Sequence, residues 1–186
     1  MKKLEISVRA ICSYSLQLLN DEEINKQLGK MLSDCLSAYE NNQIICSAGN
    51  GGSAAQSEHF IAELTGRFEE DRDGYPAINL NSNLAELSAI SNDYGYENSI
   101  SRNIKSFSKV CGVCIFFTTS GTSKNIQNAI KECKKLGISY WVLTSKKCKE
   151  EDDHFIKVPS QRTAITQELH LMILHWLVSE LEFILQ

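Results

Sequence analysis

Residues 43–64 read QIICSAGNGGSAAQSEHFIAEL, and this stretch decides the fold. Its first six residues, QIICSA (43–48), are short, apolar and rich in β-branched side chains, which is typical of a strand. A glycine-rich turn follows, and the pattern is then helical from residue 53 to about residue 66. A buried strand that passes through glycines into a helix is the first half of a βαβ unit, so we predict a parallel sheet.

The same alternation continues along the chain. Four more short apolar segments are predicted as strands: PAINL (76–80), VCIFFT (113–118), SYWVLT (139–144) and HFIKV (154–158). Helical patterns lie between and after them, at about 83–91, 97–109, 122–136 and 162–185. We therefore predict an α/β fold, a three-layer sandwich with a five-stranded parallel sheet flanked by helices on both faces.

The 186 residues suit one hydrophobic core. Residues 4 to about 41 carry helical periodicity without proline, interrupted at Asn20-Asp21, so we predict a pair of helices before the sheet. No linker or internal repeat divides the sequence. The predicted organisation is a single domain, 1–186, with N-terminal helices at 1–41 and an α/β core at 42–186.

Composition and charge exclude several classes of protein and partner. Hydrophobic residues make up 42% of the chain, and glycine and proline number only 10 and 2, which excludes a disordered or collagen-like chain. The formal net charge of −4 argues against a nucleic-acid partner, because phosphate-backbone binding requires clustered lysine and arginine. The apolar run LHLMILHWLVS (169–179) is much shorter than the roughly 20 residues that span a bilayer, so we expect no membrane partner.

Cysteine usage indicates the compartment. Seven cysteines at irregular spacing argue against a secreted disulfide framework and favour a reducing compartment, the cytoplasm. Glu5 and Arg9 interrupt the N-terminal segment, which therefore does not resemble a signal peptide. Cys111 and Cys114 form one CxxC without a second pair or a nearby histidine, so we interpret them as apolar strand residues rather than zinc ligands.

The loop after the first strand allows more than one interpretation. Gly49, Gly51 and Ala54 satisfy the dinucleotide motif GxGxxG/A. That motif also requires an acidic residue at the end of the second strand, where this chain has NLNS (79–82). We favour a tight glycine turn whose backbone N–H groups and Ser53 hydroxyl bind a small anion, with an ordinary turn as the alternative.

A second candidate anion loop follows the third strand, directly before a helical pattern. It carries five hydroxyl side chains in six residues: Thr118, Thr119, Ser120, Thr122 and Ser123. Hydroxyls combined with the N–H groups of a helix N-terminus bind phosphate without a lysine cluster, which fits an acidic protein that handles an anionic metabolite. Any single one of these residues could instead be a helix cap, but capping does not account for five of them.

His59 and Glu63 are four residues apart within a predicted helix. Their side chains therefore project from one face, where they could share a metal ion. The alternative is an ordinary hydrogen-bonded pair on a helix surface. His170 lies in the apolar part of the last helix and is expected to be a core residue.

Several segments taken together resemble the sugar isomerase (SIS) family, and most closely the branch of it that isomerises heptose phosphates. The segments that carry the resemblance are GNGGSAAQSEHFIAELTGRF (49–68), PAINL (76–80), SNDYGYEN (91–98), TTSGTSKN (118–125) and QELHLMILH (167–175). The resemblance implies the SIS fold, a homotetramer and one Zn²⁺ per subunit. It implies conversion of sedoheptulose 7-phosphate to D-glycero-D-manno-heptose 7-phosphate, which feeds heptose into lipopolysaccharide or capsule.

The resemblance also implies which residues form the site. Substrate-binding positions fall on Asn50, Gly51, Gly52, Ser53, Glu63, Asn92, Asp93, Thr118, Thr119, Ser120, Ser123 and Gln167. Zinc positions fall on His59, Glu63, Gln167 and His175. Asp93, in the predicted Asn92-Asp93 turn, is expected to fix sugar hydroxyls, with an ordinary turn residue as the alternative. Ala164 stands where relatives often carry an acid, so no role for an acid applies at that position.

An aldose–ketose isomerisation moves one proton between C1 and C2 and another between the two oxygens, through an enediol. It therefore needs a base and an acid. We predict Glu63 as the base and His175 as the acid or proton shuttle, with Zn²⁺ polarising the carbonyl. Because ligation to zinc reduces the basicity of a carboxylate, Glu63 would have to leave the metal or act through its second oxygen.

Two other functions remain open at this point. One is a non-enzymatic tetrameric SIS protein that binds sugar phosphates and regulates replication initiation. Relatives of that kind keep both loops but carry Asn at the position of His175, so the presence of Glu63 and His175 favours the enzyme. The other is an NAD-dependent enzyme, for which we expect no cofactor-dependent stabilisation.

Overall fold

The computed structural model describes residues 1–186 and contains one sheet of five parallel strands in the order β2-β1-β3-β4-β5. The strands are β1 (Ile44–Gly49), β2 (Ala77–Asn79), β3 (Cys111–Phe117), β4 (Ser139–Ser145) and β5 (Phe155–Val158). Each begins and ends within two residues of its predicted place, so the predicted five-stranded parallel sheet is confirmed.

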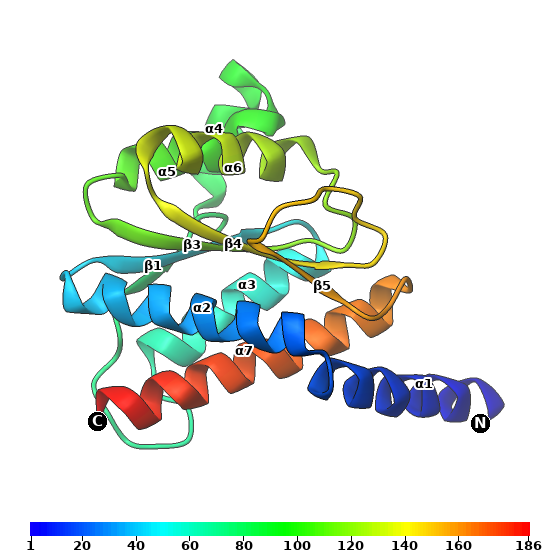
Figure 1. Cartoon of the computed structure of the whole chain (residues 1–186). Coiled ribbons are helices and arrows are strands. Elements are labelled where there is room, and N and C mark those ends of the chain that lie inside the picture. Colours follow the sequence, from blue (N-terminus) through cyan, green and yellow to red (C-terminus); the bar gives the residue numbers. More distant parts are fainter.

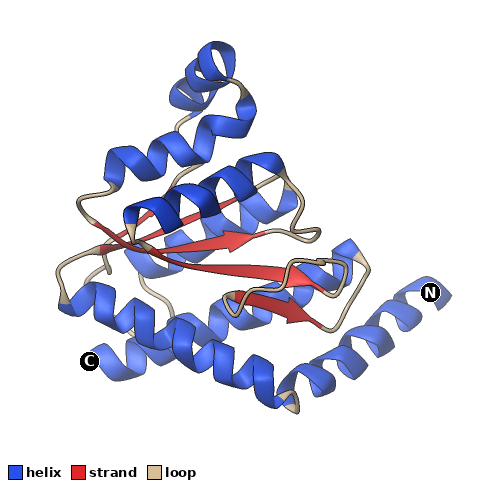
Figure 2. Cartoon of the chain, turned by 45° about the horizontal axis from the view of Figure 1, so that its top comes forward, coloured by secondary structure: helices blue, strands red, loops and turns tan.

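Helices cover both faces of this sheet and complete the predicted three-layer sandwich (Figures 1 and 2). On one side lie α4 (Leu84–Tyr94), α5 (Ser99–Phe107) and α6 (Lys124–Leu136). On the other side lie α2 (Glu22–Glu40), α3 (Gly52–Thr65) and α7 (Thr163–Leu185). Alternate strand residues pack into two separate cores, because both faces are covered. Phe117 belongs to the α3 and α7 side, and Phe116 to the α5 and α6 side.

The predicted N-terminal helix pair is present as α1 (Lys2–Leu19) and α2. The helices break at Asn20, and the Asp21 carboxylate accepts a hydrogen bond from the Ile24 N–H at 3.1 Å, as expected of an N-cap. α1 projects away from the sandwich, and none of its residues is buried (Figure 1). No helix of the chain combines the length and apolar character needed to cross a bilayer.

The helix predicted at about 97–109 is present as α5, and a short 3₁₀ helix, η1 (Tyr96–Asn98), precedes it. One local prediction is wrong. Asn92 and Asp93 lie in the last turn of α4 rather than in a turn between elements. The reason is Gly95, whose φ of +85° ends α4 at a position that favours glycine.

The CxxC cysteines are buried strand residues, as predicted, but a third cysteine joins them. Gly112 is an extra residue on β3, because Ile44 pairs with Cys111 and Ile45 with Val113. This bulge turns Cys111 to the same face as Cys114, and their sulfurs are 3.6 Å apart. Cys46 of β1 completes a buried group whose sulfurs lie within 4.8 Å of one another.

A polar network lies beside the sheet at the start of β4 and β5. The Asp152 carboxylate accepts hydrogen bonds from Lys134 Nζ at 2.9 Å, Tyr140 Oη at 2.7 Å and the His154 N–H at 3.0 Å. Although burial alone would raise the pKa of Asp152, these hydrogen bonds hold that pKa well below its ordinary value.

This network predicts a loss of stability in acid. Because the folded-state pKa of Asp152 lies below the unfolded value of about 3.9, the carboxylate stabilises the chain above that pH. The stabilisation is lost as the pH falls through the folded-state pKa. We expect Asp152→Asn to lower the free energy of unfolding by about 1–2 kcal/mol at pH 7 and to reduce its decline in acid. Urea unfolding between about pH 7 and pH 3 measures both effects, and an unchanged acid dependence in the variant would contradict this assignment.

Candidate functional site

The glycine turn between β1 and α3 leaves backbone donors free. A side chain at Gly49 would collide with the Ser53 carbonyl, and Gly51 has a φ of +55°, so both positions favour glycine. No side chain caps α3, and the N–H groups of Gly51 and Gly52 donate to no acceptor within the chain. Free N–H groups at a helix N-terminus bind anions, which supports the predicted anion site at this turn.

The hydroxyl loop after β3 keeps free donors as well. The Thr118 hydroxyl accepts a hydrogen bond from the Gly121 N–H at 3.2 Å, and Ser120 Oγ accepts one from the Thr122 N–H at 3.2 Å. α6 begins at Lys124, and its N-cap Ser123 makes no side-chain capping bond. Because the Ser123 hydroxyl is not used in capping, it is free to bind a ligand together with the first N–H groups of α6.

Asn50 and Asn125 join the two loops. The Asn50 amide donates to Asn125 Oδ1 at 2.9 Å, and the Asn125 amide donates back to Asn50 Oδ1 at 2.8 Å. The Tyr96 hydroxyl donates to the same Asn50 oxygen at 2.6 Å. The prediction missed Asn125 and Tyr96, although both lie in segments quoted for the resemblance. The two loops therefore form one cradle at the carboxyl edge of the sheet.

His59, Glu63 and His175 meet where α3 packs against α7. His59 Nε2 lies 2.8 Å from Glu63 Oε1 and 3.5 Å from His175 Nε2. The His59 and Glu63 side chains are 39% and 23% exposed, so a ligand can reach them from solvent. Two stretches more than 100 residues apart thus bring a carboxylate and two imidazoles together, as predicted.

The environment of His175 lowers its basicity. Burial lowers the pKa of its imidazole, the neighbouring His59 lowers it further, and Glu63 and Glu69 oppose the shift. The Phe68 ring stacks on the His175 ring with 5.5 Å between centroids and an interplanar angle of 19°. Phe68 is another site residue that the prediction missed, although it ends the ELTGRF segment.

His170 is not part of this group. It is fully buried, its Nε2 lies 3.1 Å from the Thr144 carbonyl oxygen, and burial lowers its pKa to about 4. Its prediction as a core residue is confirmed.

The three clustered residues fit a divalent transition metal. Zn–N and Zn–O bonds of about 2.0–2.2 Å place tetrahedral ligand atoms roughly 3.3–3.6 Å apart. The 3.5 Å between the two imidazole nitrogens lies in this range, and the 2.8 Å between His59 and Glu63 is the shorter distance of a hydrogen bond. The three donor atoms lie within 4.8 Å of one another. Two imidazoles and a carboxylate, partly open to solvent, are typical of catalytic rather than structural zinc sites.

Gln167 lies at the other end of the seam between α3 and α7. A side chain at Gly52 would come within 2.5 Å of Gln167 Nε2, so this amide faces the glycine turn. His59 lies seven residues beyond Gly52, which is about 10 Å along α3. The position of Gln167 suits contact with a ligand in the cradle, and its role as a ligand of the same metal ion stays a prediction. Gln56, which the prediction missed, holds this part of α7 by donating to the Gln167 carbonyl at 2.6 Å.

Asn92 and Asp93 make no hydrogen bond to the cradle or to the His59, Glu63 and His175 cluster. They are exposed, and the Asn92 amide donates to Asp93 Oδ1 at 2.8 Å. They lie about one turn before Tyr96, which reaches Asn50. Their role in substrate binding stays a prediction.

Comparisons with known proteins show which family the chain is similar to. The family model of the SIS domain matches residues 13–145. The chain is similar to the phosphoheptose isomerase of Aneurinibacillus thermoaerophilus, with 38% identity over 161 residues that cover 85% of this chain and 81% of that protein. It is also similar to the phosphoheptose isomerase of Helicobacter pylori strain P12, with 37% identity over 164 residues, 87% of this chain and 85% of that protein. A solved phosphoheptose isomerase structure from Francisella tularensis superposes with a TM-score of 0.88 at 26% identity and covers 96% of this chain and 95% of that chain.

Proposed function

The chain belongs to the SIS domain family, and from this premise we propose that it is a phosphoheptose isomerase that converts sedoheptulose 7-phosphate to D-glycero-D-manno-heptose 7-phosphate. The observation that carries the proposal is the meeting of Glu63 and His175 in a chain that also has an anion cradle. A phosphate group needs the cradle, and a proton transfer at carbon needs the acid–base pair.

The cradle holds the phosphate end of the substrate. Free N–H groups at the start of α3 and the Ser123 hydroxyl donate to the phosphate oxygens. The Asn50–Asn125 amide pair keeps the two loops at a fixed separation, so both contribute donors to one anion. Lysine is not required, because helix N-termini and hydroxyls provide the positive potential.

Glu63 and His175 carry the two proton transfers. Glu63 removes the proton from C1 of the ketose, which leaves an enediol, and returns a proton to C2. His175 moves the proton between O1 and O2. Glu63 Oε1 is engaged by His59, so Oε2 is the oxygen available to the substrate. This arrangement supports proton transfer through the second carboxylate oxygen of Glu63 while the first oxygen is engaged.

His59, Glu63 and His175 would hold Zn²⁺, one per subunit, with Gln167 proposed as the fourth ligand from the resemblance. When bound, zinc polarises the substrate carbonyl and so favours removal of the neighbouring C–H proton.

The experiment that tests this proposal is turnover of sedoheptulose 7-phosphate before and after chelation. We expect the zinc-loaded protein to produce the aldose phosphate, the chelated protein to lose about 100-fold or more of this activity, and added zinc to restore it. Substrate binding should survive chelation, since the cradle contains no metal ligand except Gln167. Zinc content by mass spectrometry should be one per chain and should fall in His59→Ala.

Two outcomes would contradict parts of the proposal. Full turnover by a chelated, zinc-free protein would remove the metal from the mechanism. Tight sugar-phosphate binding with no turnover in the presence of zinc would favour the regulatory alternative over the enzyme.

A homotetramer belongs to the proposal, and the surface supports self-association. α1 exposes apolar side chains on a helix without a buried residue: Leu4, Ile6, Val8, Leu16 and Leu19. An apolar hollow of about 420 Å³ lies between α1, α2 and α7, lined in part by Leu28, Met172 and Trp176. Exposed apolar surface of this kind marks a contact site.

The proposal also places the protein in the cytoplasm, where its product is used for lipopolysaccharide or capsule. It includes no nucleic-acid partner and no membrane partner.

A further inference from the structure

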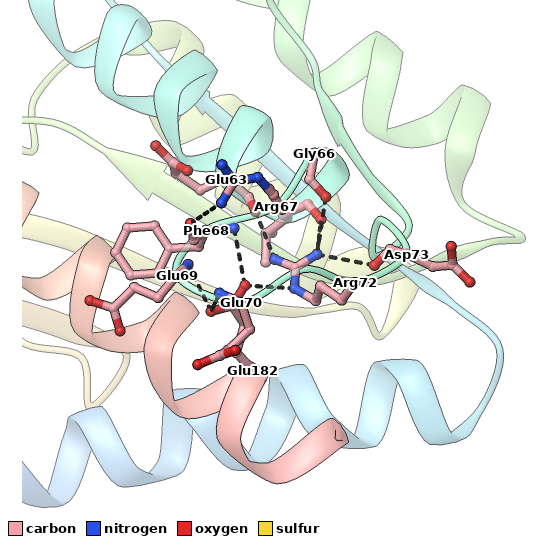
Figure 3. Close-up of polar contacts among 10 residues, drawn as sticks. Glu63, Gly66, Arg67, Phe68, Glu69, Glu70, Arg72, Asp73 and Glu182 are labelled. Carbon is pink, nitrogen blue, oxygen red and sulfur yellow. Dashed lines mark hydrogen bonds and ion pairs between the residues drawn. The ribbon is translucent and has the colours of Figure 1, made fainter.

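We infer that Arg72 and Glu182 are positioning residues that fix Glu63 and His175 relative to each other. The inference rests on the proposed function. The two side chains form an ion pair with 2.7 Å between Arg72 Nε and Glu182 Oε1, and they are only 7% and 4% exposed. Neither residue touches the cradle or has a role in the proposed proton transfers. Figure 3 shows the pair between the end of α3 and the end of α7.

Glu182 holds the segment that follows α3. Its Oε1 accepts a hydrogen bond from the Phe68 N–H at 3.0 Å, and its Oε2 accepts from the N–H groups of Glu69 at 3.1 Å and Glu70 at 3.4 Å (Figure 3). Burial alone would raise the pKa of Glu182, but the bonds from these N–H groups and from Arg72 lower it, so the carboxylate is ionised. One side chain of α7 therefore fixes three consecutive backbone groups.

Arg72 closes the C-terminal end of α3. Its Nη2 donates to the Glu63 carbonyl at 2.8 Å, and its Nη1 donates to the carbonyls of Leu64 at 3.0 Å and Gly66 at 3.3 Å (Figure 3). The last carbonyls of a helix have no partner within the helix, so a planar guanidinium with several donors satisfies them. The residue whose carbonyl Arg72 binds most closely is the candidate base itself.

Each member of the ion pair thus acts on one member of the acid–base pair. Arg72 holds the backbone of Glu63 directly. Glu182 holds the backbone of Phe68, and the Phe68 ring stacks on His175. The 2.7 Å bond between Arg72 and Glu182 connects these two sets of contacts, so the C-terminal end of α3 is tied to α7 at this point.

The chemistry of the pair suits positioning better than stability. A buried ion pair gains little stability over an apolar pair of similar size, because desolvation offsets its attraction. An apolar pair, however, could not hold three N–H groups and three carbonyls in fixed directions. A displacement of about 1 Å between reacting groups can reduce a rate about 100-fold, so these directional bonds have a catalytic consequence.

The test compares Glu182→Gln, Arg72→Lys and Phe68→Leu with the wild-type protein. We expect Glu182→Gln and Arg72→Lys to lower kcat about 10–100-fold at saturating zinc, with KM changed less than about threefold. Arg72→Lys keeps the positive charge but loses the planar guanidinium with its several donors, so we expect the charge alone not to maintain kcat. Phe68→Leu, which keeps the backbone bonds, should lose less activity. Amide hydrogen exchange at residues 68–70 should accelerate in Glu182→Gln.

Asp152→Asn is the matched control. It removes an acceptor from a comparable network at the opposite edge of the sheet, so it lowers stability without touching the site. Its kcat should stay within twofold of wild type. Glu182→Gln with unchanged kcat but faster amide exchange at residues 68–70 would overturn the inference. Equal losses of kcat in Glu182→Gln and Asp152→Asn would also overturn it, since they would show an effect of stability alone.

Zinc affinity separates this inference from the proposed function. Because the three donor atoms must keep their positions relative to one another, we expect Glu182→Gln and Arg72→Lys to bind zinc about 10-fold more weakly. If the wild-type chain does not isomerise the sugar phosphate, the proposed function fails, and zinc affinity then decides the positioning role. Unchanged affinity in both variants would overturn it. If Glu182→Gln does not fold, Arg72→Lys and Phe68→Leu carry the same comparison.

Discussion

Glu63→Gln is expected to lower kcat for sedoheptulose 7-phosphate by about 10²–10⁴-fold, or about 3–5 kcal/mol in the barrier. The amide has almost the shape of the carboxylate but cannot accept a proton from C1. It can still bond to His59, which lies 2.8 Å from Glu63 Oε1, so the fold and the cradle should be unchanged. KM should therefore change little, while turnover is lost.

The assay needs saturating zinc, because the substitution also removes an anionic metal ligand. Glu58→Gln is the matched control: it makes the same change on the same helix, at an exposed residue outside the cluster, and should leave kcat unchanged. Near-normal turnover by Glu63→Gln would remove Glu63 from the role of base.

His175→Asn is expected to reduce kcat by a similar factor, about 10²–10⁴-fold. The variant loses the imidazole that moves the proton between the substrate oxygens, and it also weakens the metal site. Asn is the residue that the regulatory SIS proteins carry at this position, so the variant should become a sugar-phosphate binder without turnover. Calorimetry with the substrate and a turnover assay at saturating zinc measure the two properties separately.

His154→Asn provides the control for that change. His154 is half-exposed and bonded to Asp152 at the edge of the sheet away from the site. The variant should keep its wild-type kcat. If His175→Asn also turned over at the wild-type rate, the shuttle would have to be another group.

The strands, the helices and the anion loops could be predicted because their signals are local. A short apolar segment with β-branched residues predicts a strand wherever it stands, and glycines before a helix predict a turn with free N–H groups. The meeting of Glu63 with His175 was predictable only through the resemblance, because nothing local relates two residues 112 positions apart.

Contacts between distant polar residues could not be predicted. Asn125 at the start of a helix is typical of ordinary capping, and no pattern shows that its amide pairs with Asn50. Arg72 stands within the acidic segment EEDRD (69–73), which is typical of a solvated loop, yet its guanidinium is buried against Glu182. The predicted turn at Asn92 was wrong for a local reason, since α4 continues to Tyr94 before Gly95 ends it.

The most direct test of the central claim follows hydrogen during turnover. The wild-type protein is incubated with sedoheptulose 7-phosphate in D₂O, and both sugar phosphates are analysed by NMR until equilibrium. If Glu63 carries the proton between the carbons, deuterium from solvent should accumulate at C2 of the aldose and at C1 of the ketose over repeated turnovers. Complete retention of hydrogen at both carbons, while the sugars interconvert, would contradict the account. A proton held on the Glu63 carboxyl, whose side chain is 23% exposed, exchanges with solvent over repeated turnovers, whereas a hydride shift between the carbons does not.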